Sequence, residues 1–433
     1  MTQARYMVRP ARSVHGELRV PGDKSISHRA LMLGAIATGP TAISGFLASE
    51  DCLATLAALT ALGVGVQRPA PTEVRVHGAG HHGLAAAAGA LDMGNAGTAI
   101  RLLTGLLAGQ TFDSTLVGDA SLMRRPMERV ATPLRAMGAR IDTTDGRPPL
   151  RIHGGAVLRG IDYALPMASA QVKSALLLAA LYAHGTTQVS EPAPTRDHTE
   201  RMLRGFGVEV ASNAGRVSLE GGQRLTGCQV AVPGDFSSAA FFIVAGCLAA
   251  HQGLTIRDVG VNPTRTGLLQ MLRLMGADIE LRPHGAATPE PIADIHVRAS
   301  PLHGIEVPQE LVALAIDEFP VFFIAAAAAA GSTTVNGAAE LRVKESDRLA
   351  VMATGLAALG IECQLLADGL RIQGGRMSGG RIDSHGDHRV AMAFAVASLI
   401  AREPIEIADV ANVATSFPGF PHLARATGLD LTD

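Results

Sequence analysis

A short stretch near the beginning of the chain places a hydroxyl group and two cations at the expected start of a helix. In Val20-Pro-Gly-Asp-Lys-Ser-Ile-Ser-His-Arg29, a Pro-Gly pair breaks an extended segment, and the aspartate and first serine can cap the helix that follows. Lys24, Ser25 and Arg29 then stand where free N–H groups and cations can bind a phosphate or a carboxylate. Taken alone, a capped helix with solvated charges explains the stretch equally well.

Other polar clusters also fall at expected helix starts. They are Asn95-Ala-Gly-Thr98 with Arg101, Arg124-Arg125-Pro126, Ser169-Ala-Gln171, Thr195-Arg-Asp197, Asp317-Glu318, Lys344-Glu-Ser-Asp-Arg348, Asp387-His-Arg389 and Ala414-Thr-Ser-Phe-Pro418. Each could be no more than a turn or a solvated helix start. If related units point these starts into one cleft, however, that cleft would bind polyanions. The expected ligands are two small anionic molecules.

The elements that must position these clusters repeat along the chain. Val232-Pro-Gly-Asp-Phe-Ser-Ser-Ala239 echoes the first stretch almost half the chain length later, which indicates two related halves. Amphipathic helices that end at a glycine and continue into a strand recur at intervals of about seventy residues. The six glycines are Gly63, Gly138, Gly207, Gly276, Gly360 and Gly428.

Each of the six units also contains a nearly all-apolar helix, which must be buried on every side. These helices are expected at 30–37, 99–108, 172–183, 239–250, 321–330 and 390–400. The fold class predicted is therefore α/β, with two inside-out, barrel-like domains of three units each, in which the helices form the interior and the sheets the wall. The boundaries expected are residues 1–22 with 235–433 for one domain and 23–234 for the other, with the functional site in the cleft between the domains.

Composition excludes several classes of protein. The 433 residues carry 37 Lys+Arg against 39 Asp+Glu, so no bulk attraction to nucleic acid or membranes is expected. Aromatic residues make up 3% of the chain, without tryptophan, which counts against base-stacking platforms. Four cysteines without metal-type spacing suggest a reducing compartment, and no apolar run approaches the roughly 20 residues of a membrane span. We expect a soluble cytoplasmic protein. His385 and His388 lack a third ligand cluster, so no metal is expected.

Taken together, the clusters resemble the 5-enolpyruvylshikimate-3-phosphate synthase family (3-phosphoshikimate 1-carboxyvinyltransferases), most closely its class II branch. The matching segments run in order along nearly the whole chain, which makes the resemblance specific. They are Pro21–Arg29, Gly94–Thr98, Gly118–Leu122 with Arg125-Pro126, Met167–Ser174, Thr195–His198, Ile316–Pro320, Leu341–Arg348 and Asp387–Arg389.

The resemblance implies two inside-out α/β domains that close on shikimate 3-phosphate and phosphoenolpyruvate, in a monomer without cofactor or metal. It implies that shikimate 3-phosphate contacts Lys24, Ser25, Arg29, Ser169, Gln171, Arg196, Asp317 and Lys344. It implies that phosphoenolpyruvate contacts Lys24, Gly97, Arg125, Gln171, Arg348 and Arg389, with Lys344 between the two substrates. The catalytic residues implied are Asp317, Glu345 and Lys24.

The chemistry of such an enzyme fits these residue types. Adding the 5-hydroxyl group across an enol double bond needs one proton delivered to the methylene carbon and one removed from the hydroxyl. Glu345 is the candidate acid and Asp317 the candidate base, and the assignment of each proton in each step stays open. Several cations would hold two mutually repelling anions together, so positioning and electrostatics would supply most of the rate.

The sequence departs from some relatives at three places. Thr415 stands where they carry a lysine, so one phosphoenolpyruvate contact is lost or replaced, and Ala170 stands where others have a second serine. Gly97 is the small residue that is alanine in some glyphosate-tolerant relatives. We therefore expect glyphosate to inhibit this protein.

Two alternatives remain. A UDP-N-acetylglucosamine enolpyruvyltransferase would share the inside-out repeat, but it would show Lys-Asn in place of Lys24-Ser25 and a cysteine near Arg125. A non-catalytic anion-binding protein built on a decayed enzyme is the other. The intact set of Lys24, Asp317, Lys344, Glu345 and Arg389 argues against it, and a turnover assay separates the two.

Overall fold

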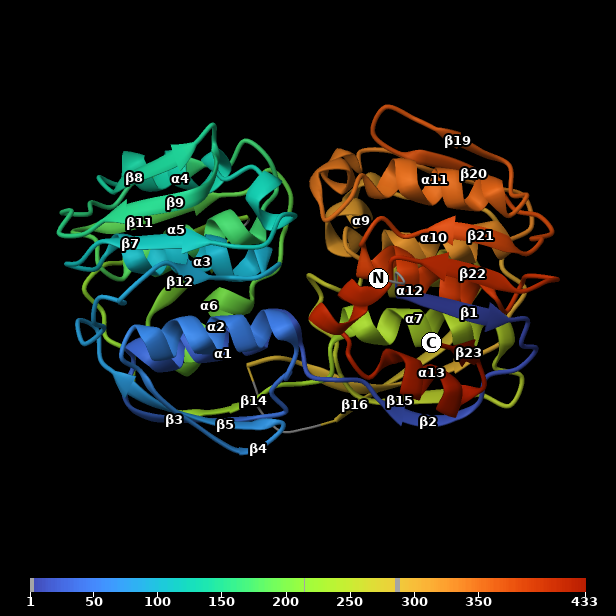
Figure 1. Cartoon of the computed structure of the whole chain (residues 1–433), viewed down its shortest axis with the longest axis horizontal. Coiled ribbons are helices and arrows are strands. Elements are labelled where there is room, and N and C mark those ends of the chain that lie inside the picture. The colour runs from blue at the N-terminus through green and yellow to red at the C-terminus, as the bar shows by residue number, and fades with distance from the viewer. Residues whose placement is uncertain (1–3, 214, 285–288) are drawn as a thin grey trace. The chain divides into compact units, whose positions relative to one another are not determined.

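The chain folds into two compact units, which Figure 1 shows as ribbons. The computed structural model describes residues 4–213, 215–284 and 289–433. We call Gly22–Val232 the inserted unit, and Met1–Pro21 together with Pro233–Asp433 the terminal unit. In each unit helices lie inside and strands outside, as the inside-out prediction requires. Because the chain divides into these two compact units, we propose that each unit is a domain.

The inserted unit contains three repeats of a buried helix, an amphipathic helix and a small sheet. Its helices are α1 (Lys24–Ile36), α2 (Glu50–Ala61), α3 (Gly97–Ala108), η1 (Leu122–Arg124), α4 (Glu128–Ala136), α5 (Ala170–Ala180) and α6 (His198–Gly205). Its strands are β3 (Thr38–Ser44), β4 (Gly65–Ala70), β5 (Glu73–Ala79), β6 (Leu91–Asp92), β7 (Ser114–Val117), β8 (Arg140–Thr144), β9 (Arg147–His153), β10 (Asp162–Ala164), β11 (Thr186–Ser190), β12 (Val210–Asn213), β13 (Arg216–Glu220) and β14 (Gln229–Ala231).

The terminal unit has the same plan. Its helices are α7 (Phe236–Ala249), α8 (Gly267–Leu274), α9 (Gln309–Val312), η2 (Ala313–Ala315), α10 (Phe319–Ala328), η3 (Ala339–Val343), α11 (Arg348–Ala358), α12 (His388–Ala397), η4 (Ala411–Thr415) and α13 (Phe420–Thr427). Its strands are β1 (Arg5–Arg9), β2 (Gly16–Arg19), β15 (Leu254–Gly260), β16 (Asp278–His284), β17 (Ile292–Arg298), β18 (Ser332–Val335), β19 (Cys363–Leu365), β20 (Leu370–Gln373), β21 (Gly380–Asp383), β22 (Ile405–Ala408) and β23 (Asp430–Thr432).

The six predicted apolar helices are α1, α3, α5, α7, α10 and α12, and their side chains are buried almost throughout. Four of the six begin with a capping side chain, which satisfies a backbone N–H group that would otherwise be buried without a partner. The caps are Asp23, Ser169, Asp235 and Asp387. The charged side chains of these helices lie within the first two turns, and the later turns are almost entirely apolar.

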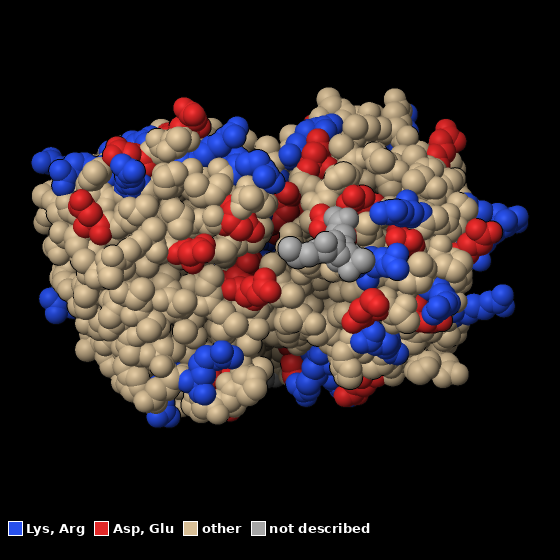
Figure 2. Space-filling model, viewed as in Figure 1, with Lys and Arg blue, Asp and Glu red and all other residues tan. Residues whose placement is uncertain are grey.

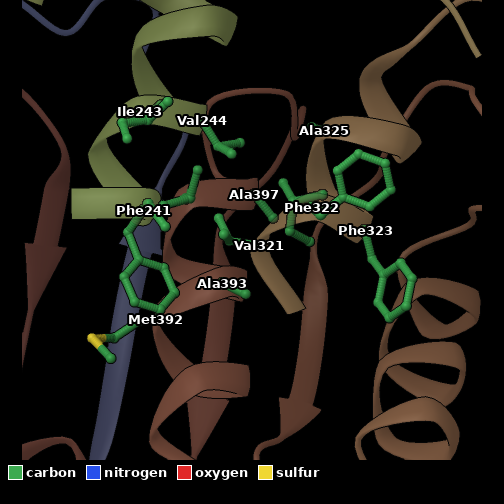
Figure 3. Packing of buried hydrophobic residues seen from close by; sticks show 14 of the residues in the cluster. Phe241, Ile243, Val244, Val321, Phe322, Phe323, Ala325, Met392, Ala393 and Ala397 are labelled. Carbon is green, nitrogen blue, oxygen red and sulfur yellow. The ribbon is translucent and has the colours of Figure 1, made fainter. Parts of the chain in front are cut away.

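The core of the terminal unit is formed where α7, α10 and α12 pack together (Figure 3). Phe241 of α7, Phe322 and Phe323 of α10 and Met392 of α12 all belong to one buried cluster. Burying one such side chain completely contributes about 1.5–3 kcal/mol, so this layer is a main source of the unit's stability.

The amphipathic helices end at the predicted glycines. At Gly63, Gly138, Gly207, Gly276, Gly360 and Gly428 the backbone φ lies between 82° and 111°. An L residue with a side chain rarely adopts this conformation, and glycine adopts it without steric cost. The glycine therefore stops each helix and starts the strand that returns to the sheet.

Six small sheets, counted over the described residues, cover the helices. Five have four strands, in the orders β14-β3-β5-β4, β6-β7-β9-β8, β10-β11-β13-β12, β16-β17-β15-β2 and β21-β22-β1-β23. The sixth, β18-β20-β19, has three strands, and a neighbouring segment adds parallel bridges from His303 to Ala330 and from Glu306 to Thr334. The unit that contains α10 thus keeps the plan of the others with a less regular edge.

Two edge strands explain why the terminal unit is discontinuous. Strand β2 precedes α1 in the chain but pairs in parallel with β15, which follows α7. Strand β14 precedes α7 but pairs in parallel with β3, which follows α1. The chain passes from one unit to the other directly after each of these strands, at the repeated Pro-Gly pairs.

No helix among the described residues is both long and apolar enough to cross a bilayer. Lys and Arg are interspersed with Asp and Glu over the faces in view in Figure 2, in keeping with the net charge of −2.

One ionisable side chain is enclosed within the apolar part of α1. His28 is fully buried, and its Nδ1 lies 2.7 Å from Thr55 Oγ1 of α2. Burial, together with the charges of Lys24 and Arg29, lowers the pKa of His28 from 6.5 to about 3. The imidazole is therefore neutral in the folded protein.

This burial predicts a pH-dependent loss of stability. The unfolded chain takes up a proton on His28 below pH 6.5, whereas the folded chain does so only near pH 3, so stability is lost as pH falls below 6.5. Lowering the pH from 7 to 5 should cost about 2 kcal/mol of unfolding free energy through this residue. Urea unfolding of wild type and His28→Gln at both pH values measures it. An equal loss in both proteins would contradict the prediction.

Candidate functional site

The inserted unit brings several predicted site residues to the starts of α1, α3 and α5. We call the predicted residues of this unit the inserted cluster. They are Lys24, Ser25, Arg29, Gly97, Arg125, Ser169, Gln171 and Arg196. The predicted residues of the terminal unit form the terminal cluster. They are Asp317, Lys344, Glu345, Arg348 and Arg389.

At the start of α1, the cap and the cation are separate residues. Asp23 accepts a hydrogen bond from the backbone N–H of Ile26 at 2.9 Å, which ends the extended segment before Lys24. Lys24 Nζ lies 2.9 Å from Asp51 Oδ2, and both side chains are mostly buried. Ser25, which was expected to share the capping, lies inside the first turn instead, and its carbonyl oxygen accepts from Arg29.

Around α3, a second arginine connects the predicted residues. Arg101 Nη1 donates to Gln171 Oε1 at 2.7 Å and to the Gly97 carbonyl oxygen at 3.2 Å. Gln171 Nε2 in turn donates to Thr98 Oγ1 at 3.0 Å, so the first turns of α3 and α5 are joined by side chains. Arg101 was among the polar residues noted in the sequence, but its role as the connector depends on a contact 70 residues away.

The predicted helix start at Arg124-Arg125-Pro126 needs a correction. The first arginine ends the 3-10 turn η1, and α4 begins only at Glu128, so Arg125 lies in the connection between them. There its Nη2 donates to Asn95 Oδ1 just before α3. A Cβ atom added at Gly97 would lie 2.7 Å from Arg125 Nη1 and 3.1 Å from Arg101 Nη1. Glycine at position 97 therefore leaves the room that these two guanidinium groups occupy.

The start of α5 and the segment before α6 supply the remaining predicted residues of this unit. Ser169 is the cap of α5 and accepts from the Val172 N–H group at 3.4 Å. Arg196 is half-buried in the segment that ends at Asp197, immediately before α6. Arg29 is 3% exposed and donates to Thr199 Oγ1 at 2.7 Å and to Ser174 Oγ at 2.8 Å, which ties α1 to both helices.

In the terminal unit, one buried arginine joins three carboxylates. Arg348, 1% exposed, donates to Glu345 Oε2 at 2.6 Å and to Asp387 Oδ2 at 2.8 Å, and its Nη1 lies 3.4 Å from Asp317 Oδ1. Burial alone lowers the pKa of Arg348, but the charges of Asp387 and Glu345 outweigh it, so the pKa is raised. The Arg348 guanidinium therefore contacts both the candidate acid, Glu345, and the candidate base, Asp317.

Two further cations lie against the same carboxylate segment. Lys344 Nζ is 3.4 Å from Asp317 Oδ1, and Arg389 Nη1 donates to the Asp317 carbonyl oxygen at 2.9 Å. Burial and the charge of Arg348 lower the pKa of Arg389. Three cations therefore converge on Asp317. The predicted helix start at Lys344 is also corrected, because η3 ends at Val343 and α11 begins at Arg348, capped by Asp347.

The position where some relatives carry a lysine holds a small neutral side chain. Thr415 ends η4 rather than starting a helix, is buried, and donates to the carbonyl oxygen of Asn412 at 2.7 Å. Asn412 Nδ2 donates to the Gly386 carbonyl oxygen at 2.7 Å, close to the start of α12. This segment therefore contacts the α12 start through neutral hydrogen bonds.

Two important partners were not among the predicted site residues. Asp51 pairs with Lys24, and its position in the first turn of α2 is the one sequence signal that could have suggested it. Asp387 both caps α12, through the Arg389 N–H group, and pairs with Arg348. The sequence placed it beside a site residue without indicating the second contact.

One group among the described residues has a spacing that a metal ion could use. It comprises Asp258, His284 and Asp294, outside both clusters. Each of its carboxylates already pairs with an arginine, Asp258 with Arg19 and Asp294 with Arg257, so the group is accounted for as an ion-pair network.

The arrangement can bind anions and move protons. Helix starts and cations in the inserted cluster suit phosphate and carboxylate groups. The terminal cluster combines two carboxylates with three cations, which suits proton transfer beside a negatively charged reactant.

Comparison with known proteins agrees with this chemistry. The sequence profile of the family described as EPSP synthase (3-phosphoshikimate 1-carboxyvinyltransferase) matches residues 8–423. A 3-phosphoshikimate 1-carboxyvinyltransferase of Methylococcus capsulatus is 58% identical over 98% of this chain and 97% of its own length. One of Alkalilimnicola ehrlichii is 59% identical over 99% and 96%. An EPSP synthase structure from Acinetobacter baumannii is 52% identical, with a TM-score of 0.89 and full coverage of both chains. The chain therefore belongs to the EPSP synthase (3-phosphoshikimate 1-carboxyvinyltransferase) family.

Proposed function

We propose that this protein transfers the enolpyruvyl group of phosphoenolpyruvate to the 5-hydroxyl group of shikimate 3-phosphate and releases phosphate. The observation that carries the proposal is the pair of carboxylates on one buried arginine, Asp317 and Glu345 on Arg348, in a chain of this family. The reaction belongs to the shikimate pathway, in which the product leads to chorismate and the aromatic amino acids.

The reaction proceeds by addition followed by elimination. The 5-hydroxyl oxygen bonds to C2 of phosphoenolpyruvate, the hydroxyl proton passes to a base, and the double-bond electrons take a proton at the methylene carbon. The resulting tetrahedral phospho-ketal then expels phosphate and loses a methyl proton, which restores the double bond. We assign the base to Asp317 and the acid to Glu345, each oriented by Arg348.

The other residues bind and orient the two anions. We assign shikimate 3-phosphate to Lys24, Ser25, Arg29, Ser169, Gln171, Arg196, Asp317 and Lys344, and phosphoenolpyruvate to Lys24, Gly97, Arg125, Gln171, Arg348 and Arg389. The anion-binding helix starts support the first set, and the convergence of Arg348 and Arg389 on Asp317 supports the second. Because the substrates repel each other, most of the rate enhancement would come from holding them together.

The hydrogen bonds of two arginines also refine these assignments. Arg29 and Arg348 are almost fully buried and bonded to protein groups, so each would orient neighbouring site residues in addition to any direct contact with a substrate phosphate. Monomeric state and a cytoplasmic location stay predictions.

The first test is turnover with catalytic variants. Purified protein given both substrates should release phosphate and form a product that carries an added enolpyruvyl group, as mass analysis can establish. Asp317→Ala and Glu345→Gln should each lower kcat by about 10²–10⁴-fold, the usual contribution of a general acid or base. Asp278→Ala and Glu280→Gln, at exposed positions in the same unit, are matched controls that should keep wild-type kcat.

Failure of folded wild-type protein to release phosphate, or full activity in both catalytic variants, would overturn the proposal. Release of phosphate from phosphoenolpyruvate with another acceptor in place of shikimate 3-phosphate would favour a different enolpyruvyltransferase.

The second test concerns the space at Gly97. We expect glyphosate to inhibit the wild type in competition with phosphoenolpyruvate. In Gly97→Ala the new methyl group must displace Arg125, so inhibition should weaken at least about tenfold, equivalent to about 1.4 kcal/mol. The KM for shikimate 3-phosphate should change little. Gly89→Ala, where an added Cβ meets no atom within 4 Å, is the matched control. Equal inhibition of all three proteins would contradict the prediction.

A further inference from the structure

The inserted unit contains a buried ion triad for which neither binding nor proton transfer accounts. Lys173 lies two residues after Gln171 in α5, and its side chain is 1% exposed. Its Nζ is 2.7 Å from Glu191 Oε2 and 2.7 Å from Glu200 Oε1, and those side chains are 4% and 1% exposed. Burial lowers the pKa of Lys173, but the two glutamates raise it by more, so the ammonium group stays charged.

Such a triad is poorly explained by stability alone. Removing three charges from water costs several kcal/mol per ion, and their attraction often fails to exceed this cost. Among the described residues, Glu200 Oε2 also has no hydrogen-bond partner, which adds to the penalty. A role in fixing one arrangement of the surrounding segments is the better explanation, since buried polar groups can specify position at the expense of stability.

The two glutamates sit at the ends of the segment that carries Arg196. Glu191 follows β11, its backbone N–H group donates to the Gly215 carbonyl oxygen at 2.8 Å, and its Oε1 accepts from Thr195 Oγ1. Glu200 lies in the first turn of α6, beyond the other end of the segment. Lys173 thus ties α5 to residues on both sides of Arg196.

The neighbouring residues connect the same helices to Arg29. Ser174 follows Lys173 and Thr199 precedes Glu200, and Thr199 Oγ1 donates to Ser174 Oγ at 2.7 Å. Both hydroxyl oxygens accept from the Arg29 guanidinium. Arg29 is therefore hydrogen-bonded to the same pair of helices, α5 and α6, that Lys173 joins.

We propose that Lys173 is a positioning residue for the shikimate 3-phosphate half of the site, acting through Glu191 and Glu200 on Arg196 and Arg29. The proposal rests on the proposed function. A phosphate dianion is bound well only if its cations are already in place, because ordering long side chains on binding costs affinity. Lys173 is too deeply buried to touch the ligand, so its effect must be indirect.

The main test uses a charge-free replacement of the triad. Lys173→Met/Glu191→Gln/Glu200→Gln keeps similar volumes and leaves no unpaired buried charge. We expect its KM for shikimate 3-phosphate to rise about tenfold, with kcat and the KM for phosphoenolpyruvate within about threefold of wild type, since ground-state binding is lost uniformly. Calorimetry with shikimate 3-phosphate alone should show the same loss of affinity.

Two further variants keep the test decisive. Thr195→Val cuts only the link from Glu191 to the Arg196 segment, should fold normally, and should raise the same KM by a smaller factor. Arg204→Met is the control on the opposite connection of α6, where Arg204 bonds the Val210 carbonyl oxygen and Ser212 Oγ, and should leave the KM unchanged.

The outcomes separate the two proposals. Wild-type turnover with an unchanged KM for shikimate 3-phosphate in both Thr195→Val and the folded triple variant overturns the positioning role alone. A fall in kcat with equal changes in both KM values means a merely structural role and overturns it as well. Absence of wild-type turnover and of shikimate 3-phosphate binding overturns the function and the positioning role together.

Discussion

The constraint on which the rest of this structure depends is the burial of six helices that are apolar on every face. Such helices can lie only in an interior, so the sheets have to form the outer wall of each unit. In most α/β folds the order is reversed, and helices cover a central sheet. Charged groups in these helices lie only within the first two turns, close to the free N–H groups that need partners. The concentration of caps, lysines and arginines at the helix starts follows directly from this constraint.

At the start of α12, one side chain both caps the helix and forms an ion pair. Asp387 caps α12 and at the same time holds Arg348, which in turn contacts Asp317 and Glu345. Removing water from such a group strengthens every interaction within it and makes any unpaired member costly. The terminal cluster is therefore tightly specified, as a site that has to hold an acid and a base in defined orientations requires.

In the inserted unit, buried arginines join the helices mainly through neutral side chains. Arg101 joins the first turns of α3 and α5 through Gln171, and Arg29 joins α1 to α5 and α6 through two hydroxyl groups. The Lys173 triad also joins α5 to α6 and to the segment after β11, through side chains that are almost fully buried. Predicted site residues such as Arg29 are thus hydrogen-bonded to other buried side chains, an arrangement that favours a preorganised site.

The sequence alone determined the features that depend on neighbouring residues. The apolar helices, the helix-ending glycines such as Gly63 and the Asp23 cap all followed from local patterns. The family resemblance rested on short segments of the same kind. Helix starts were less well predicted, since Arg125, Lys344 and Thr415 lie in connections or 3-10 turns, where local capping signals do not apply.

Only the tertiary structure decided which of these residues are partners. Lys24 pairs with Asp51, Arg348 with Asp387 and Lys173 with Glu191, and each pair joins segments that lie apart in the chain. Such contacts depend on how buried helices pack, and no spacing along the chain encodes them. The edge strands show the same limit, because β2 and β14 pair with strands that follow distant helices. Helix caps and helix ends depend on adjacent residues and can be read from the sequence. Ion pairs between distant residues depend on the fold that brings the charges together.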